Sequence, residues 1–365
     1  MKSRNIAYIP ELDHLRLLAA LLVFAYHFFH FYRGEWRSYP DLPFLGLIVE
    51  GHTGVGLFFV LSGFIFMTIA LANSEIDYRS FMRNRLLRIA PLFLVVFVVA
   101  ISIGRDRFVA TDLLYLFVTN LGGAPTSWHF ATGPAWSISV EFTFYLVFPF
   151  LAAATLKRGP LYLVKWLALL LIIKLAAYHA TDNSRHMLYS TLVGRFDQFL
   201  IGMLAAIAYA RFQTTIQRWG RPLLLLAAVV VLIGVGIQAR WLSFLAPEPK
   251  QPLWVIWGTI EAGFWAVLVV AYLGARVPWP DFLHRAFCRG GEWSFSFYMW
   301  HALIIFAVHQ SLGSIGGTGA LALGMNGVMV LSVTLVFAWL SYNLIEAPFL
   351  DMRSRYGRPT AKDGL

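Results

Sequence analysis

The stretch LDHLRLLAALLVFAYHFFHFY, residues 12–32, decides the fold class of this chain. It is long and apolar enough for a helix to cross the roughly 30 Å hydrocarbon core of a bilayer. A cleaved signal peptide fits poorly, because the run is too long, no small-residue cleavage site follows it, and it contains Arg16 and His27. The stretch therefore predicts a transmembrane helix that carries ionisable side chains.

Similar apolar runs recur along the chain. Of the 365 residues, 59% are hydrophobic and 13% are charged, whereas about a quarter of the residues of a soluble domain are charged. We expect an all-α membrane protein with about ten transmembrane helices, as one domain at 1–350 followed by a short basic cytosolic tail at 351–365. The predicted spans lie near residues 12–32, 52–73, 91–104, 134–156, 161–180, 192–210, 222–240, 252–273, 294–312 and 319–345.

The basic residues predict the orientation. Most of the 29 Lys and Arg residues fall in loops on the side of the N-terminus, which places both termini in the cytosol by the positive-inside rule. The amphipathic segment FVATDLLYLFVTNL, residues 108–121, is interpreted as an interfacial helix, because an eleventh span there would put Lys157 and Arg158 on the wrong side. Whether this segment crosses the membrane stays open.

Two function classes are disfavoured by composition. The net charge of +10 fits membrane interfaces and cytosolic loops better than nucleic-acid binding. The single cysteine, Cys288, excludes an intrachain disulfide framework and a multi-cysteine metal site, and no metal is expected.

Ionisable side chains inside the spans indicate where function lies, because a charge at the bilayer centre costs several kcal/mol or more unless it is paired or solvated. Arg16 and His27 are separated by about three helical turns, roughly 16 Å, so both project from one face. Asp13 lies one turn before Arg16, where it can pair with it. A structural ion pair and a hydrogen-bonded histidine would give the same pattern, but Arg16 below His27 favours a functional site.

Glu141 supplies a second group at the depth of His27. It follows Trp136, where the predicted helix enters from the outer side. A buried carboxylate level with a buried imidazole predicts an acid/base pair, in which Glu141 orients the ring of His27 and stabilises its charged form.

Several spans are expected to converge on one polar pocket in the outer half of the membrane. Snorkelling to the interface is an equally good interpretation of two of its members, Arg195 and Asp197. Ser62 and His301 are expected further in, and Asp13 near the cytosolic end. The residues predicted to bind substrate or line the pocket are Asp13, Ser62, Trp136, Ser139, Arg195, Asp197 and His301.

The predicted cytosolic loop DYRSFMRNRLLRIAP, residues 77–91, concentrates arginines. Arg85 and Arg88 are three residues apart and form a fork suited to phosphate oxygens, with Arg83 beside them. Ordinary positive-inside charge would also explain this loop.

Seven stretches, in this order, resemble the membrane-bound acyltransferase-3 family of carbohydrate O-acyltransferases. They are IPELDHLRLLAALLVFAYHF (9–28), GVGLFFVLSGFIF (54–66), FMRNRLLRIAPLF (81–93), AWSISVEFTFYLVFP (135–149), GRFDQFLIGMLAA (194–206), SFSFYMWHALI (294–304) and IEAPF (345–349). The resemblance implies transfer of an acyl group, by family habit acetyl, from acyl-CoA to a carbohydrate hydroxyl. The acceptor would be a surface or secreted polysaccharide, or its lipid-linked precursor, in a bacterial inner membrane.

The family's signatures fall on residues already singled out. Its Arg-x10-His signature matches Arg16 and His27, its Arg-x-x-Arg signature matches Arg85 and Arg88, and its helix-four glutamate matches Glu141. The resemblance therefore implies a catalytic role for Arg16, His27 and Glu141, and acyl-CoA binding by the arginines.

The chain also departs from the family. The glycine that often follows the first-helix aspartate is His14 here, and the acidic residue common beside the glutamate is Phe142. Many relatives carry a soluble hydrolase-like domain after the last helix, and we expect the form without it.

Other interpretations stay open. A secondary transporter or flippase for a glycan or lipid would also bury Arg, His and Glu, but would often show inverted repeats. A regulatory protein could keep an inactive acyltransferase scaffold. The transfer could be direct or pass through an acyl-enzyme on His27, Ser139 or Ser62. The sequence specifies neither the acceptor nor the oligomeric state.

Overall fold

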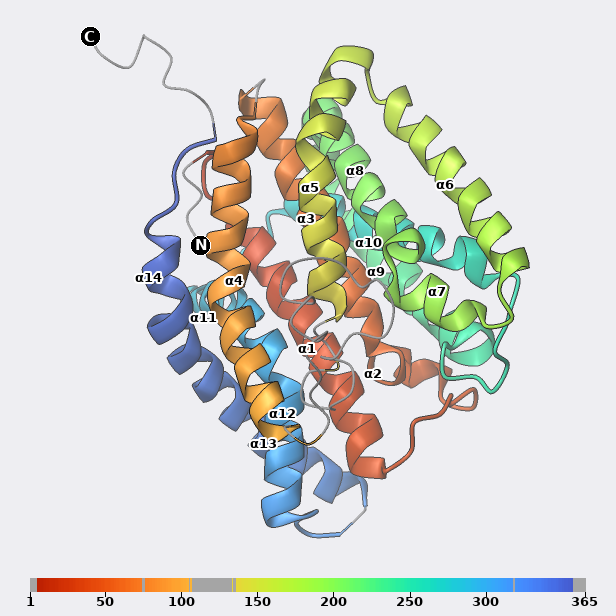
Figure 1. Cartoon of the computed structure of the whole chain (residues 1–365), viewed down its shortest axis with the longest axis vertical. Helices are drawn as coiled ribbons and strands as arrows, with labels where there is room; N and C mark the ends of the chain where they lie inside the picture. The colour runs from red at the N-terminus through yellow and green to blue at the C-terminus, as the bar shows by residue number, and fades with distance from the viewer. Residues whose placement is uncertain are drawn as a thin grey trace.

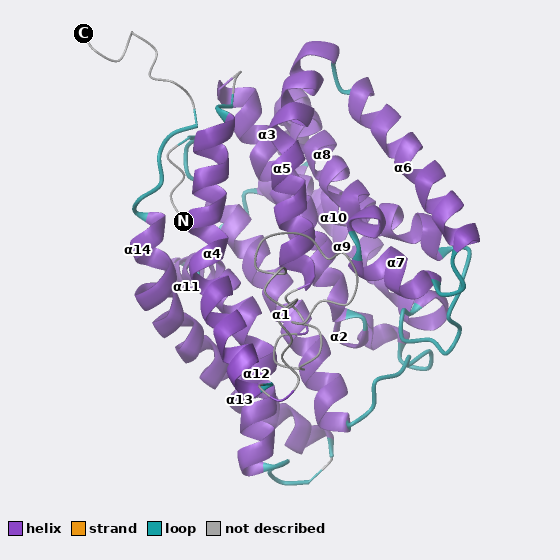
Figure 2. Cartoon of the chain, viewed as in Figure 1, coloured by secondary structure: helices purple, strands orange, loops and turns teal. Residues whose placement is uncertain are grey.

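The computed structural model describes residues 5–73, 76–104, 106, 133, 136–317 and 319–356, and this part of the chain is helical with no strand (Figures 1 and 2). All ten apolar runs lie on long helices, which confirms the all-α class. The long helices are α1 (Pro10–Arg33), α3 (Gly54–Asn73), α4 (Tyr78–Ile103), α5 (Trp136–Arg158), α6 (Leu161–Ala180), α8 (Leu192–Arg218), α9 (Gly220–Ile237), α10 (Trp254–Ala275), α12 (Ser294–Leu312) and α13 (Ala320–Ser341).

Shorter elements connect the long helices. Nine helical segments within the described ranges are long and apolar enough to cross a membrane, which supports a multi-pass membrane protein. The short elements are α2 (Gly46–Val49), α7 (Ser184–Ser190), α11 (Asp281–Glu292), α14 (Ala347–Leu350), the 3-10 turns Pro43–Leu45 and Gly51–Thr53, and the π-helical turns Gln238–Leu242 and Tyr342–Glu346.

The third predicted span, residues 91–104, begins later than the helix that contains it. Helix α4 starts at Tyr78 instead of near residue 91, and the Asp77 side chain caps it by accepting a hydrogen bond from the Ser80 N–H at 2.8 Å. The apolar run starts only near Pro91, because arginines occupy the preceding turns of the same helix. The arginines expected in a loop therefore have the fixed spacing of a helix. The segment 108–121 lies outside the described residues.

The two ends of the described chain meet. The backbone N–H of Tyr356 donates to the Asn5 side chain at 2.7 Å, and its carbonyl accepts from the N–H of Asp77 at 2.9 Å. Both ends thus lie at the end of the bundle where α4 begins (Figure 1). That both termini face the cytosol stays a prediction.

Helices α3 and α8 pack with their backbones in contact at the centre of the bundle. A Cβ atom at Gly63 would lie 2.1 Å from the carbonyl oxygen of Phe199, and one at Gly202 would lie 2.1 Å from that of Val60. Only glycine permits this reciprocal approach, as is typical of small residues between membrane helices. Helix α3, which carries Ser62, is therefore held at a fixed position, whereas α6 lies at the periphery (Figure 1).

Candidate functional site

Two adjoining cavities open between α1, α3 and α4. The arginine cavity, of about 780 Å³, lies against residues 5–9 and the C-terminal segment 353–356, and the inner cavity, of about 730 Å³, extends toward α5 and α12. The two cavities adjoin and share part of their lining, and the shared residues are Arg16, Ile65, Phe66, Arg85 and Arg88.

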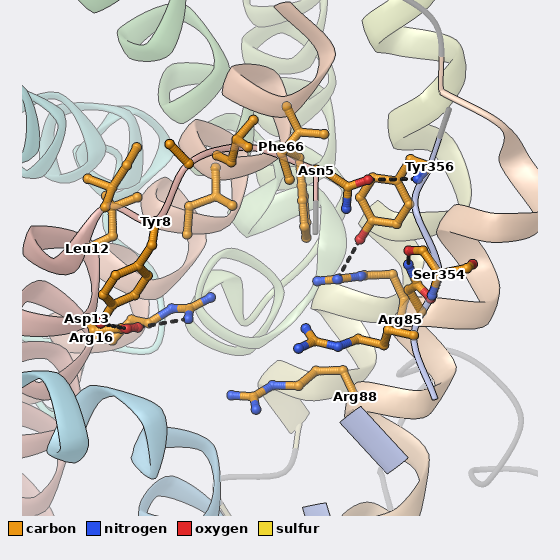
Figure 3. A pocket seen from close by; sticks show the side chains of 17 residues that line it. Asn5, Tyr8, Leu12, Asp13, Arg16, Phe66, Arg85, Arg88, Ser354 and Tyr356 are labelled. Carbon is orange, nitrogen blue, oxygen red and sulfur yellow. Dashed lines mark hydrogen bonds and ion pairs between the residues drawn. The ribbon is translucent and has the colours of Figure 1, made fainter. Parts of the chain in front are cut away.

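Arginine side chains face one another across the arginine cavity. Arg85 and Arg88 extend from α4 toward Arg16 on α1 (Figure 3). Arg16 pairs with Asp13 at 3.2 Å, as predicted, and the Tyr8 hydroxyl donates to the same carboxylate at 2.8 Å. Asp13 therefore balances one of the three cations.

The two α4 arginines are held differently. Arg85 donates to the Tyr356 hydroxyl at 2.6 Å and stacks over the Phe66 ring at 4.9 Å, while its Nε has no hydrogen-bond partner among the described residues. Arg88 pairs with the buried Glu346 at 2.9 Å, and Ser296 donates to the other oxygen of that carboxylate at 2.5 Å. The charge of Arg88 is thus balanced by a carboxylate, whereas Arg85 is held by a neutral hydroxyl and keeps its charge for an anion.

Arg83 lies on another face of the helix. It is exposed, donates to the carbonyl of Met352 at 3.2 Å, and lines neither cavity. Two residues along an α-helix correspond to a turn of about 200°, so Arg83 points away from the cavity that Arg85 lines.

A fourth arginine of the cavity, Arg353, was not anticipated. The segment that carries it, expected as a frayed tail, is fixed on α4, because Asn84 donates to the carbonyl of Ser354 at 2.7 Å and accepts from its N–H at 3.0 Å. Burial, with repulsion from Arg88 and Arg85, lowers the pKa of Arg353 to about 10. The cavity thus concentrates positive charge, as an anion site requires.

His27 belongs to a histidine pair. Its Nδ1 lies 2.9 Å from the carbonyl oxygen of Val23 and 3.1 Å from Nε2 of His301, whose own Nδ1 lies 2.5 Å from the carbonyl oxygen of Tyr298. Both carbonyls need an N–H donor, so each ring carries its proton on Nδ1 in the neutral state. This tautomer leaves the lone pair of His27 on Nε2, where it can accept a proton.

The structure does not join Glu141 directly to His27. Glu141 lines the inner cavity and accepts a hydrogen bond from the Ser62 hydroxyl at 2.6 Å; within the described ranges no hydrogen bond or ion pair connects it to the imidazole. Tyr298 links the two regions, since its side chain lines the inner cavity while its carbonyl orients His301. Among the contacts within the described residues, the Val23 carbonyl and His301 orient His27.

Arg195 and Asp197 lie outside both cavities. Each is an almost fully buried partner in an ion pair, Arg195 with Glu261 at 3.0 Å and Asp197 with Lys174 at 2.7 Å. Both side chains are therefore paired inside the bundle and do not extend to the membrane interface. His27 also lines neither cavity, so a pocket that these residues share with His27 stays a prediction.

Two further predicted pocket residues also lie away from the cavities. The ring of Trp136 stands 5.9 Å from the Arg195 guanidinium and belongs to that buried cluster. Ser139 is half-buried, and its carbonyl accepts from the Thr143 hydroxyl at 2.9 Å.

A second buried acid and imidazole escaped the sequence analysis. Glu50 and His52 lie 2.9 Å apart just before α3, and the Gln238 amide approaches both. Their spacing on either side of Gly51 was the available signal. No cavity described above reaches them.

Comparison with known proteins places most of the chain in one family model, described as an acyltransferase domain, which matches residues 9–343. The chain is 26% identical to Acyltransferase MdmB of Streptomyces mycarofaciens, over 98% of this chain and 95% of that protein. It is 25% identical to O-acetyltransferase OatA of Staphylococcus aureus (strain NCTC 8325 / PS 47), over 93% of this chain and 57% of that protein.

A further relative, Putative O-acetyltransferase SACOL0978 of Staphylococcus aureus (strain COL), is 24% identical, over 95% of this chain and 58% of that protein. The chain thus spans just over half the length of these staphylococcal relatives. No solved structure matches the chain.

Proposed function

We propose that this chain, which belongs to the acyltransferase-3 family, transfers an acyl group from acyl-CoA to a hydroxyl of a carbohydrate acceptor. The observation that carries the proposal is that the arginine cavity, which is rich in positive charge, adjoins the inner cavity that Glu141 lines. Acyl-CoA has the matching shape, with phosphates at one end and a thioester at the end of a long, weakly polar arm. The names of the staphylococcal relatives favour acetyl as the acyl group.

The phosphates of the donor would bind in the arginine cavity. Guanidinium groups bind phosphate oxygens with two parallel hydrogen bonds, and Arg85 has donors to spare. Arg353 adds positive charge, and a bound phosphate would relieve its repulsion with Arg88 and Arg85. Arg16, at the junction of the two cavities, would bind the last phosphate before the arm turns inward.

The arm would extend through the inner cavity. Apolar side chains such as Phe58 and Ile65 line this path, while Glu141 and Ser62 supply its polar groups. A carboxylate can accept hydrogen bonds from the amide N–H groups of the pantetheine arm. This position gives Glu141 a role in placing the donor, in keeping with its lack of a direct bond to His27.

His27 would act as the general base. Its Nε2 takes the proton of the acceptor hydroxyl while the oxygen attacks the thioester carbonyl carbon. The carbon–sulfur bond then breaks, the ester forms, and the CoA thiolate leaves and takes up the proton. His301 keeps the ring oriented through its contact with Nδ1. The acceptor would approach from the end of the bundle opposite the arginines.

The proposed setting is a bacterial cytoplasmic membrane. The arginine cavity lies at the end of the bundle where both ends of the described chain meet, and the distribution of basic residues predicts that this end faces the cytosol. CoA would then bind from the cytosol. A surface polysaccharide or its lipid-linked precursor is the proposed acceptor.

The test separates donor binding from transfer. Purified full-length protein receives acetyl-CoA and a candidate acceptor glycan, and released CoA and acetylated glycan are quantified by chromatography and mass spectrometry. The variant His27→Ala should bind CoA normally but transfer roughly 10²- to 10⁴-fold more slowly. The control His179→Ala changes an exposed histidine on the peripheral α6 and should keep the wild-type rate. A folded His27→Ala protein that transfers at the wild-type rate would overturn the assignment of the base.

A further inference from the structure

We propose that His14, His284 and Cys288 form a binding site for a transition-metal ion of the Zn²⁺ class, where α1 meets α11. Their ligand atoms all lie within 4.8 Å of one another. His284 and Cys288 are one turn apart on α11, so both project from one face toward α1, which supplies His14. This site takes no part in the proposed transfer reaction.

The ligand separations fit tetrahedral coordination. The sulfur of Cys288 lies 3.4 Å from Nε2 of His14 and 3.8 Å from Nε2 of His284. Zinc–sulfur and zinc–nitrogen bonds of about 2.3 and 2.0 Å place a sulfur and a nitrogen ligand about 3.5 Å apart around a tetrahedral ion. The two sulfur–nitrogen separations bracket this value. The two imidazole nitrogens, which lie within 4.8 Å of each other, would have to come to about 3.3 Å, so binding an ion requires a modest rotation of a side chain.

A supporting hydrogen-bond chain orients the buried histidine. Nδ1 of His14 lies 2.8 Å from the Tyr272 hydroxyl, which also accepts a hydrogen bond from the Trp279 indole N–H at 2.8 Å. With Nδ1 engaged in this way, Nε2 points toward Cys288. Metal-binding histidines are usually fixed by such a bond at their second nitrogen, which sets the tautomer and the ring orientation.

The backbone holds the two helices at the required distance. A Cβ atom at Gly291 would lie 2.2 Å from the carbonyl oxygen of Asp13, the residue before His14. At Gly290 a Cβ atom would lie 2.8 Å from the Leu17 side chain. The end of α11 therefore rests directly on α1 beside the proposed site, which makes the site largely preorganised.

The ligand types select the ion. Two neutral imidazoles and one thiolate suit borderline or soft transition metals such as Zn²⁺, and they suit Mg²⁺ or Ca²⁺ poorly. An ion at this site would brace α11 against α1 next to Asp13, which lines the arginine cavity.

The single cysteine gives a direct test that needs no variant. Full-length protein, purified without a polyhistidine tag, is labelled with a maleimide, which can react only at Cys288. Zn²⁺ at micromolar concentration should slow labelling at least about tenfold, because a coordinated thiolate is shielded, while Mg²⁺ should have no effect. Labelling at the same rate with and without Zn²⁺ would overturn the proposal.

Cobalt binding tests the ligand set. Co²⁺ should bind at about one ion per chain with a sulfur-to-cobalt charge-transfer band, and Cys288→Ser should abolish the band. His284→Ala, at a half-buried position, should weaken binding at least about tenfold, whereas His179→Ala should leave it unchanged. Size-exclusion chromatography confirms that each variant is folded. A thiol that only donates hydrogen bonds to the imidazoles would give no band, and that result would also overturn the proposal.

Discussion

Replacing Arg85 by alanine should weaken CoA binding by roughly 10- to 150-fold. Arg85 lines both cavities and has an Nε without a partner in the described part of the chain. A hydrogen bond between charged groups contributes about 1.5–3 kcal/mol, and each 1.4 kcal/mol changes the dissociation constant about tenfold. The predicted range assumes that one such phosphate contact is lost. Arg85→Lys keeps the charge but not the planar fork, so its affinity for CoA should lie between those of the wild type and of Arg85→Ala.

The assay is isothermal titration of CoA into detergent-solubilised protein at two salt concentrations. The dissociation constant of the wild type should rise more steeply with salt than that of Arg85→Ala, because the variant has lost one screened charge interaction. Arg83→Ala is the matched control, since it removes the same charge two residues away from an exposed position outside the cavities. Its affinity should change by no more than about twofold.

Two results would refute this reasoning. Wild-type affinity in a folded Arg85→Ala protein would mean that the phosphates bind elsewhere. Equal weakening in Arg83→Ala and Arg85→Ala would mean that only the general positive potential of this end attracts CoA.

Three further predictions follow from the buried charges and from the orientation. Arg353→Ala should raise the melting temperature of the ligand-free protein, because it removes repulsion with its arginine neighbours, while weakening CoA binding; a lower melting temperature would contradict this account. Lys174→Met should lower the free energy of unfolding by about 3–5 kcal/mol in a denaturation series, since it leaves the Asp197 carboxylate buried without its cation. An unchanged free energy of unfolding would show that the pair contributes little. A topology reporter inserted after Lys157 should report the cytosol and one near Arg37 the outside, and the reverse would invert the proposed donor side.

Helix positions and local pairs were readable from the sequence. Length and hydropathy located ten helices, and the Asp13–Arg16 pair followed from its spacing of three residues. The start of α4 was missed because hydropathy does not distinguish a basic helix turn from a basic loop. The helix capping signal was Asp77, which precedes Ser80 by three residues.

Contacts between distant helices were not readable. Ser62 and Glu141 are 79 residues apart, and His27 and His301 are 274 residues apart, so their meeting depends on how each helix is rotated in the bundle. The predicted pairing of Glu141 with His27 rested on their similar depth in the membrane. Depth fixes the level of a residue but not the direction in which its side chain points. The same limit concealed the docking of Arg353 on α4.

The contribution of residues 353–356 to the arginine cavity has a consequence for biosynthesis. These residues follow every long helix of the chain, so they are the last part of the cavity wall to leave the ribosome. A nascent chain that has already inserted its helices still lacks Arg353 and the Tyr356 hydroxyl that holds Arg85. The proposed donor site is thus completed only after residues 353–356 have been synthesised, and a shorter nascent chain should not yet bind CoA as the longer chain is proposed to do.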